Sequence, residues 1–154
     1  MQQETFLTRE GFQKLEEELD YLKNVRRPEV AEAIHDAKMD GDVSENAGYD
    51  EAKRQQAFLE GRIMTIESML KNAVIIETNG PTETVNLGSR VTVQEDGYEP
   101  ETYVIVGSAE ADPGGGRISN ESPLGKALLG QRVGDRIKFK APAGTVEMEV
   151  LRID

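Results

Sequence analysis

The sequence of 154 residues contains no cysteine, no tryptophan and a single histidine. Without cysteine the chain can form neither disulfides nor thiolate zinc sites, and it has no thiol nucleophile. The lone His35 excludes a metal site made of several histidines, and it allows Ser-His chemistry only if His35 is itself the base. A self-contained hydrolase or metalloenzyme is therefore a poor match to this composition.

Aromatic residues make up 5% and apolar residues 37% of the chain, which is little material for one broad core. Basic residues are also scarce, because 18 stand against 29 acids for a formal net charge of -11. Bulk attraction to nucleic acid or an anionic membrane is then unfavourable, so any nucleic-acid role must be local or indirect. The N-terminal stretch lacks a signal-peptide pattern and no apolar run approaches membrane-spanning length, so we expect a cytoplasmic protein without membrane contact.

The two halves of the chain differ in composition. Up to about Lys71 there is one proline, whereas from Asn79 onward glycine and proline recur every few residues between short β-branched runs. A turn-forming cluster at 78–81 marks the boundary between these halves. We therefore predict two domains, one over residues 1–76 and the other over residues 80–154.

The first half is predicted to form an antiparallel helical hairpin. Its apolar residues recur at spacings of three and four, the pattern of a narrow seam between helices. The seam positions are Phe12, Leu15, Leu19 and Leu22, then Val30, Ile34 and Ala37, and in the second helix Ala52, Gln56, Leu59, Ile63, Ile66 and Leu70. Thr8 is a suitable N-cap, Pro28 bends the first helix or begins a new turn, and Gly41 ends it. Each rod would be roughly 40 to 48 Å long at about 1.5 Å per residue.

The second half is predicted to be α+β. Strand-like segments lie at 91–93, 102–106, 135–140 and 145–153. One short helix is expected after Ser122 as N-cap and Pro123 at the first helical position, and Gly130 ends it. The DPGGG stretch at 112–116 is predicted to be a loop, because it lacks the lysine and the strand-to-helix context of a phosphate-binding loop.

Two carboxylates, Asp42 and Glu45, lie in the GDVSEN segment between the two predicted helices. If the second helix begins here, both side chains emerge on one side of the hairpin tip. Two interpretations stay open: Asp42 is an N-cap with Glu45 as its capping-box partner, or both bind a cation. Two carboxylates alone make a poor magnesium site, because Mg²⁺ keeps its waters unless phosphates or other acids join. A catalytic role would need a partner that supplies the rest.

Two segments of the chain resemble the GreA/GreB family of bacterial transcript cleavage factors. The first is RRPE at 26–29 followed by GDVSENAGYDEAK, and the second is ISNESPLGKALLGQRVGD at 118–135. The similarity runs over nearly the whole chain, and both motifs stand in the family's order. It implies an α+β protein with an N-terminal antiparallel coiled-coil hairpin and a C-terminal domain of FKBP-like fold.

The resemblance also implies a function, namely a transcription elongation factor that acts on bacterial RNA polymerase. In the family the hairpin enters the polymerase secondary channel, and the tip acids act at the active centre on the 3′ end of backtracked RNA. Carried over by position, these acids are Asp42 and Glu45, which would bind Mg²⁺ jointly with the polymerase and RNA. The polymerase would remain the enzyme, and the chain would be a monomer with no tightly bound cofactor and no activity of its own.

Further residues become candidates beside this tip. Ser44 and Asn46 could hold the water or the RNA, or could cap the helix; Tyr49 fits the family's tip aromatic and could stack on a displaced base, or simply pack. A basic group could hold the extruded RNA or form an ordinary solvated face: Arg26, Arg27, Lys53 and Arg54. A docking surface for the C-terminal domain could include Ser122, Pro123 and Leu124, which could equally be a helix start and core.

The chain departs from the family pattern at Gly48, where an acid is common, and at Met39 and Asp40, where neutral or basic residues are more familiar. Gly48 weakens the first turn of the helix by about 0.5 to 1 kcal/mol relative to alanine. The sparse basic face places the chain nearer to the GreA branch than to GreB. The rival functions are a channel-plugging inhibitor without cleavage activity, a prolyl isomerase and a coiled-coil adaptor; both tip acids are present, which favours stimulation of cleavage.

Overall fold

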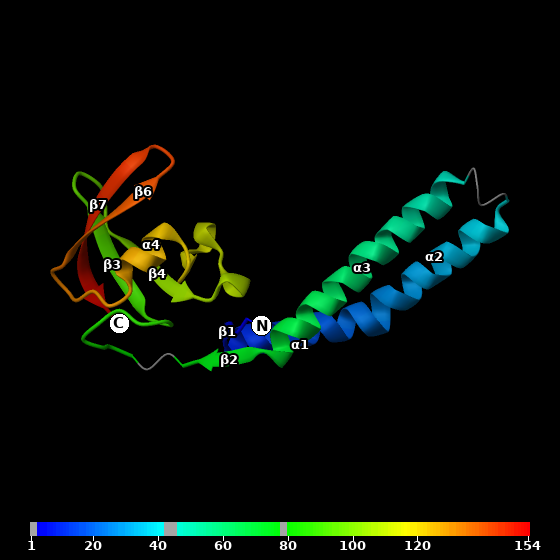
Figure 1. Ribbon diagram of the computed structural model, residues 1–154, viewed down its shortest axis with the longest axis horizontal. Coiled ribbons are helices and arrows are strands. Elements are labelled where there is room, and N and C mark those ends of the chain that lie inside the picture. The colour runs from blue at the N-terminus through cyan, green and yellow to red at the C-terminus, as the bar shows by residue number, and fades with distance from the viewer. Residues whose placement is uncertain (1–2, 42–45, 78–79) are drawn as a thin grey trace. The chain divides into compact units, whose positions relative to one another are not determined.

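The computed structural model describes residues 3–41, 46–77 and 80–154 (Figure 1). These residues divide into two compact units, and each is described by itself. Unit 1 consists of Gln3–Gly11 together with Ala73–Asp154, and unit 2 of Phe12–Asn72. In the described part of the chain, no helix combines the length and the apolar character needed to cross a bilayer.

Unit 2 is the predicted antiparallel helical hairpin. The elements that build it are α1 (Arg9–Tyr21), the π-helical turn η1 (Leu22–Arg26), α2 (Arg27–Met39) and α3 (Ala47–Lys71). Figure 1 shows α2 and α3 running side by side. The predicted N-cap is confirmed, because Thr8 Oγ1 accepts a hydrogen bond from the Gly11 amide at 3.0 Å.

Pro28 begins a new turn, which was one of its two predicted effects. Proline has no amide proton to donate inside a helix, so the ladder of hydrogen bonds must change near it. The change is the π turn just before it, where the Arg27 amide donates to the Leu22 carbonyl. Tyr21 and Arg26 keep right-handed helical backbone angles, so the chain passes from α1 to α2 without leaving the helix.

The predicted seam forms the core of the hairpin. The cluster consists of Val30, Ile34, Ala52, Leu59 and Ile63, against which Leu19, Leu22 and Tyr49 pack. Ile63 is 2% exposed, and complete burial of such a side chain contributes about 1.5 to 3 kcal/mol. The seam positions Gln56 and Leu70 are only half-buried, so the packing is densest in the middle of α3.

Unit 1 is built around a five-stranded sheet in the order β5-β4-β3-β7-β6. Its elements are β3 (Arg90–Glu95), β4 (Glu101–Val106), η3 (Ser108–Glu110), η4 (Pro113–Gly115), β5 (Arg117–Ser119), α4 (Pro123–Leu128), β6 (Arg136–Ala141) and β7 (Gly144–Ile153). Neighbouring strands are antiparallel except β4 and β5, which are parallel. Side chains on one face of the sheet form the core together with α4, and Val91, Ile105 and Leu128 are each 0% exposed. The predicted fold class, α+β with an N-terminal helical hairpin and a C-terminal α+β domain, is confirmed.

The local predictions for this unit hold at its helix and at its glycine-rich loop. Ser122 caps α4, since its Oγ accepts from the Gly125 amide at 3.0 Å, and Pro123 is the first helical residue. The 112–116 stretch is a loop with one 3-10 turn, in which the Asp112 side chain accepts from the Gly115 amide.

A parallel pair of strands, β1 (Thr5–Thr8) and β2 (Ala73–Ile76), also belongs to unit 1, and the sequence did not indicate it. The β1 backbone passes so close to Gly107 that a Cβ there would lie 2.1 Å from the Phe6 carbonyl oxygen. No side chain fits at that position, so the contact between β1 and η3 depends on glycine.

Glu110 ties the start of α1 to η3 inside unit 1. Only 8% of its side chain is exposed, and the carboxylate accepts from the Thr8 amide at 2.6 Å and from Thr8 Oγ1 at 2.7 Å. Arg117 Nη2 donates to the same carboxylate at 2.7 Å. A Cβ at Gly11 would lie 2.2 Å from Glu110 Cδ, so this carboxylate fits against the helix only because residue 11 is glycine.

Candidate functional site

The connection between α2 and α3 carries the candidate site, and its predicted acids fall outside the described residues. Asp42, Ser44 and Glu45 are all in the 42–45 segment that the structure leaves out. Asp40 and Gly41 on one side and Asn46 on the other are described, so the site can be built up to its two edges.

Asn46 closes the hairpin at this connection. Its Oδ1 accepts a hydrogen bond from the Tyr49 amide at 3.0 Å, which makes it the N-cap of α3. Its Nδ2 donates to the Ala37 carbonyl in the last turns of α2. One side chain therefore caps one helix and holds the other. The capping alternative raised for Asn46 is therefore present in the structure, whereas the capping role considered for Asp42 lies outside the described residues.

Tyr49 packs against the hairpin core and is half-buried. The packing alternative raised for this aromatic is therefore present in the structure, and stacking on a base stays a prediction. Gly48, the residue before it, lies close to the cap: a Cβ there would lie 3.2 Å from Asn46 Oδ1. That distance is tighter than an ordinary contact, so glycine relieves crowding around the cap even though it weakens the helix.

The four predicted RNA-binding residues are all engaged with side chains of the hairpin. Arg27 makes a bidentate pair across the hairpin with Glu60, with Nε and Nη2 each 2.9 Å from a carboxylate oxygen. The remaining pairs join side chains three positions apart in the sequence: Arg26 with Glu29, Arg54 with Glu51, and Lys53 with Gln56. Each of these four basic side chains is therefore already bonded to another side chain of the hairpin.

The Arg27–Glu60 pair shifts the pKa of both groups. The hydrogen bond to Glu60 raises the pKa of Arg27, and the same contact lowers the pKa of Glu60 below its ordinary value. Both groups are therefore charged at neutral pH. Because they lie on the hairpin surface, the pair aligns the two helices and contributes little to stability.

The predicted docking residues of unit 1 form the start of a helix. Ser122 Oγ donates to the Ser119 carbonyl and caps α4, and Leu124 packs against the core. Pro123 is exposed between them. The helix-and-core alternative is therefore present, and a docking role for these residues stays a prediction.

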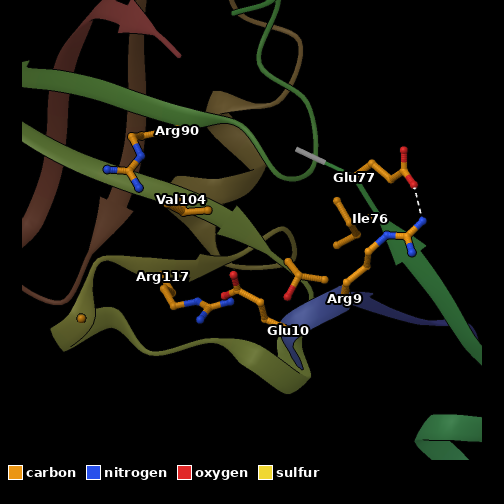
Figure 2. A pocket seen from close by; sticks show the side chains of 9 residues that line it. Arg9, Glu10, Ile76, Glu77, Arg90, Val104 and Arg117 are labelled. Carbon is orange, nitrogen blue, oxygen red and sulfur yellow. Dashed lines mark hydrogen bonds and ion pairs between the residues drawn. The ribbon is translucent and has the colours of Figure 1, made fainter. Parts of the chain in front are cut away.

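Unit 1 also contains a hollow that the sequence did not reveal. Its volume is about 710 Å³, and Figure 2 shows the side chains that line it. The lining residues are Thr8, Arg9, Glu10, Ile76, Glu77, Arg90, Val104, Gly115 and Arg117. No sequence signal could place them together, because they come from five separate segments joined by the two sheets. Within residues 3–41, 46–77 and 80–154, no group of three or more acids and histidines could hold a metal ion.

Comparison with known proteins covers both halves of the chain. The family model described as "Transcription elongation factor, N-terminal" matches residues 5–75, and the one described as "Transcription elongation factor, GreA/GreB, C-term" matches residues 80–154. The chain is 54% identical over 155 residues to the transcription elongation factor GreA of Thermoanaerobacter pseudethanolicus, with 99% of each chain covered. It is 52% identical over 149 residues to the GreA of Bacillus subtilis, covering 96% of this chain and 94% of the relative.

Among solved structures, the GreA factor homolog 1 (Gfh1) protein of Thermus thermophilus is 32% identical, with 99% of both chains covered and a TM-score of 0.44.

The helical hairpin, the sheet domain and the two matched segments together define a transcription elongation factor. The chain belongs to the GreA/GreB family, and the relatives described above are GreA proteins.

Proposed function

We propose that this chain binds bacterial RNA polymerase, inserts the end of its hairpin into the secondary channel and stimulates cleavage of backtracked RNA. The observation that carries the proposal is the closed hairpin end, where Asn46 joins α2 to α3 beside the acidic 42–45 segment. Membership in the elongation factor family supports the same partner. The chain would work in the cytoplasm, as a monomer, on the enzyme's own reaction.

The dimensions of the hairpin suit entry into a deep pore. With 25 residues, α3 is about 37 Å long at the usual rise per residue. A pair of packed helices is narrow, and its seam is buried between the helices, so the outer faces of the rod are free to contact the channel wall. A rod of this kind can carry side chains at its end to a site that a globular domain could not reach.

Asp42 and Glu45 are the residues that we assign to the chemistry. Carboxylate oxygens are the ligands that Mg²⁺ prefers, and two of them leave the remaining positions to the polymerase, the RNA and water. The donor set of the tip therefore fits a magnesium ion held jointly. The ion, when bound, would supply the activation of water for phosphodiester hydrolysis. The two side chains would hold and orient it or position the water, and Ser44 would support them.

The neighbouring residues would position the RNA. Tyr49 lies in the first turn of α3 and would stack the face of its ring on a displaced base, while its packing against the seam holds the ring. Contacts to the extruded 3′ segment would come from Arg26, Arg27, Lys53 and Arg54. Arg27 would have to release Glu60 or share it, so the contact to a phosphate would exchange one anionic partner for another.

The test is the length of the RNA in a stalled, backtracked elongation complex. Added with Mg²⁺, the wild-type protein should shorten the transcript from its 3′ end and restore extension. The variant Asp42→Ala/Glu45→Ala should bind the polymerase and do neither. Cleavage by the double variant at the wild-type rate would contradict the role of the tip. Slowed nucleotide addition by the wild type without any cleavage would instead identify a channel-plugging inhibitor.

A further inference from the structure

The hollow of unit 1 has a basic wall on the outer face of the five-stranded sheet. Arg90 on β3 is registered opposite Val104 on β4, and Val104 is registered opposite Arg117 on β5. Residues that are paired across neighbouring strands point to the same face of a sheet. The three side chains therefore form one row, and Figure 2 shows Val104 between the two arginines.

The row suits a single anionic group above an apolar floor. Arg90 and Arg117 start roughly 10 Å apart, because two strand spacings separate them, and each side chain is long enough to lean toward the other. Guanidinium groups bind carboxylate and phosphate through paired hydrogen bonds, and they do so more specifically than lysine. Val104 and Ile76 add an apolar surface beside the cationic groups.

The two arginines differ in how they are held. Arg117 is fixed by its bond to Glu110, whose side chain is 8% exposed, so the guanidinium is oriented before any ligand arrives. Arg90 forms no ion pair with any other residue in the described part of the chain. It is the cation that is available to a partner.

The rest of the lining limits what the ligand can be. Arg9 is already paired with Glu77 at 2.8 Å, and Glu10 adds a second acid to that side of the hollow. A nucleic acid or a polyphosphate would meet these acids and the chain's net charge of -11. A single carboxylate with apolar neighbours can pair with the arginines of the row, and its one charge is repelled less by the acids of the chain than several charges would be.

We propose that this hollow is a docking pocket for an acidic side chain, Asp or Glu, on an apolar-flanked segment of a protein partner. The charge complementarity of the Arg90–Val104–Arg117 row carries the proposal. It rests on the proposed function, in which that partner is RNA polymerase, and it assigns to unit 1 a binding surface separate from the hairpin end.

The test compares Arg90→Ala with Arg132→Ala in binding core RNA polymerase, measured by fluorescence anisotropy of the labelled full chain. Arg132 is an exposed arginine of the same unit, precedes β6 and lies outside the hollow, so it controls for the loss of one positive charge. Arg90→Ala should raise the dissociation constant on the order of tenfold, and Arg132→Ala should leave it near the wild-type value. Arg90→Lys, which keeps the charge and loses the planar fork, should fall between them.

The concentration dependence of cleavage separates this inference from the proposed function. At limiting protein, Arg90→Ala should cleave backtracked RNA more slowly than the wild type and Arg132→Ala should match the wild type; raising the protein concentration should shrink the difference, because the pocket acts in binding only. If the wild type neither binds nor cleaves, the proposed function fails. If the wild type does both and Arg90→Ala binds as tightly as it does, the pocket assignment alone is overturned.

The chemistry of the occupant is tested with three probes at equal ionic strength: a short capped peptide with one glutamate flanked by leucines, sodium pyrophosphate and a single-stranded RNA hexamer. The Nε–Hε resonances of Arg90 and Arg117 should shift with the peptide, which should also weaken polymerase binding in competition. Shifts with pyrophosphate or RNA and none with the peptide would overturn the assignment of an acidic protein segment.

Discussion

Asn46 and Glu110 each join two elements through one polar side chain. Asn46 caps α3 through its carbonyl oxygen and holds the end of α2 through its amide nitrogen. Glu110 caps the start of α1 and orients Arg117. In both cases the side chain satisfies backbone groups that a helix end leaves unpaired. Removing the side chain should therefore destabilise both the helix end and the second element that it contacts.

Replacing Asn46 with alanine should therefore destabilise the hairpin end by about 0.5 to 2 kcal/mol, the usual effect of losing an N-cap. Amide hydrogen exchange at Tyr49 reports it directly, because that amide donates to the cap. Asn46→Asp retains the acceptor and loses the donor to Ala37, so it should protect the Tyr49 amide and still loosen the end of α2. Unchanged exchange in Asn46→Ala would show that the cap contributes nothing.

Glu110→Gln removes a charge from a side chain that is almost fully buried. Hydrogen bonds of charged groups contribute about 1.5 to 3 kcal/mol, so unit 1 should lose stability of that order in urea unfolding. The Thr8 and Gly11 amides should exchange faster, since both belong to the network around this carboxylate. Glu147→Gln is the control, because it breaks an exposed pair with Arg136 and should have little effect. Equal losses from both variants would contradict the anchoring role of Glu110.

The sequence predicted the caps that act locally and missed those that act at a distance. Thr8 and Ser122 precede their helices directly, and standard N-cap preferences identify them. Glu110 bonds to a residue 102 positions away, and no local pattern indicates such a contact. At the hairpin end the sequence offered several caps, Asn46 among them, and helix α3 begins at Ala47 with Asn46 as its cap.

At the scale of the elements, the hairpin depends on a thin seam. Each helix buries one stripe and leaves large apolar side chains such as Phe58 and Met64 exposed, at 74% and 70%. A narrow seam has few neighbours to compensate for a lost contact, so single truncations in it should be costly.

Ile63→Ala should destabilise the hairpin by about 2 to 5 kcal/mol, because the residue is 2% exposed at the centre of the seam. Met64→Ala, one position further along the same helix, should change stability by less than about 0.5 kcal/mol. Urea unfolding followed by far-UV circular dichroism measures both. A similar loss for the two variants would mean that the seam is not what holds α3.

The periodicity of apolar residues predicted the helices well, since a seam repeats its signal over many turns. The strands β1, β2 and β5 escaped the same analysis. Each has four residues or fewer and pairs in parallel with a partner that is distant or lies beyond a loop. Without a hairpin turn or sustained alternation, such strands leave no local trace. The hollow could not be predicted either, because only the pairing of β3 with β4 and of β4 with β5 brings the residues of its basic row together.

At the scale of the whole molecule, the acidity of the chain and its scarcity of nucleophiles are consistent with a protein that works on another enzyme's reaction. A net charge of -11 disfavours independent binding to nucleic acid. The hairpin end and the hollow would then divide the work, with catalytic support at the 42–45 segment and recognition of the partner at Arg90 and Arg117. Both matched segments of the chain are elongation factor domains.

The most direct measurement is the single-turnover rate of RNA cleavage in a backtracked complex as a function of Mg²⁺ concentration. Wild-type protein should raise the maximal rate and lower the Mg²⁺ concentration needed for half of it, because its tip would contribute carboxylate ligands. The nearly isosteric variant Asp42→Asn/Glu45→Gln should bind the polymerase as well as the wild type does. With it, the maximal rate and the Mg²⁺ concentration for half of that rate should equal those of the polymerase alone. The account would be contradicted if this variant accelerated cleavage as much as the wild type does and showed the wild type's dependence of the rate on Mg²⁺ concentration.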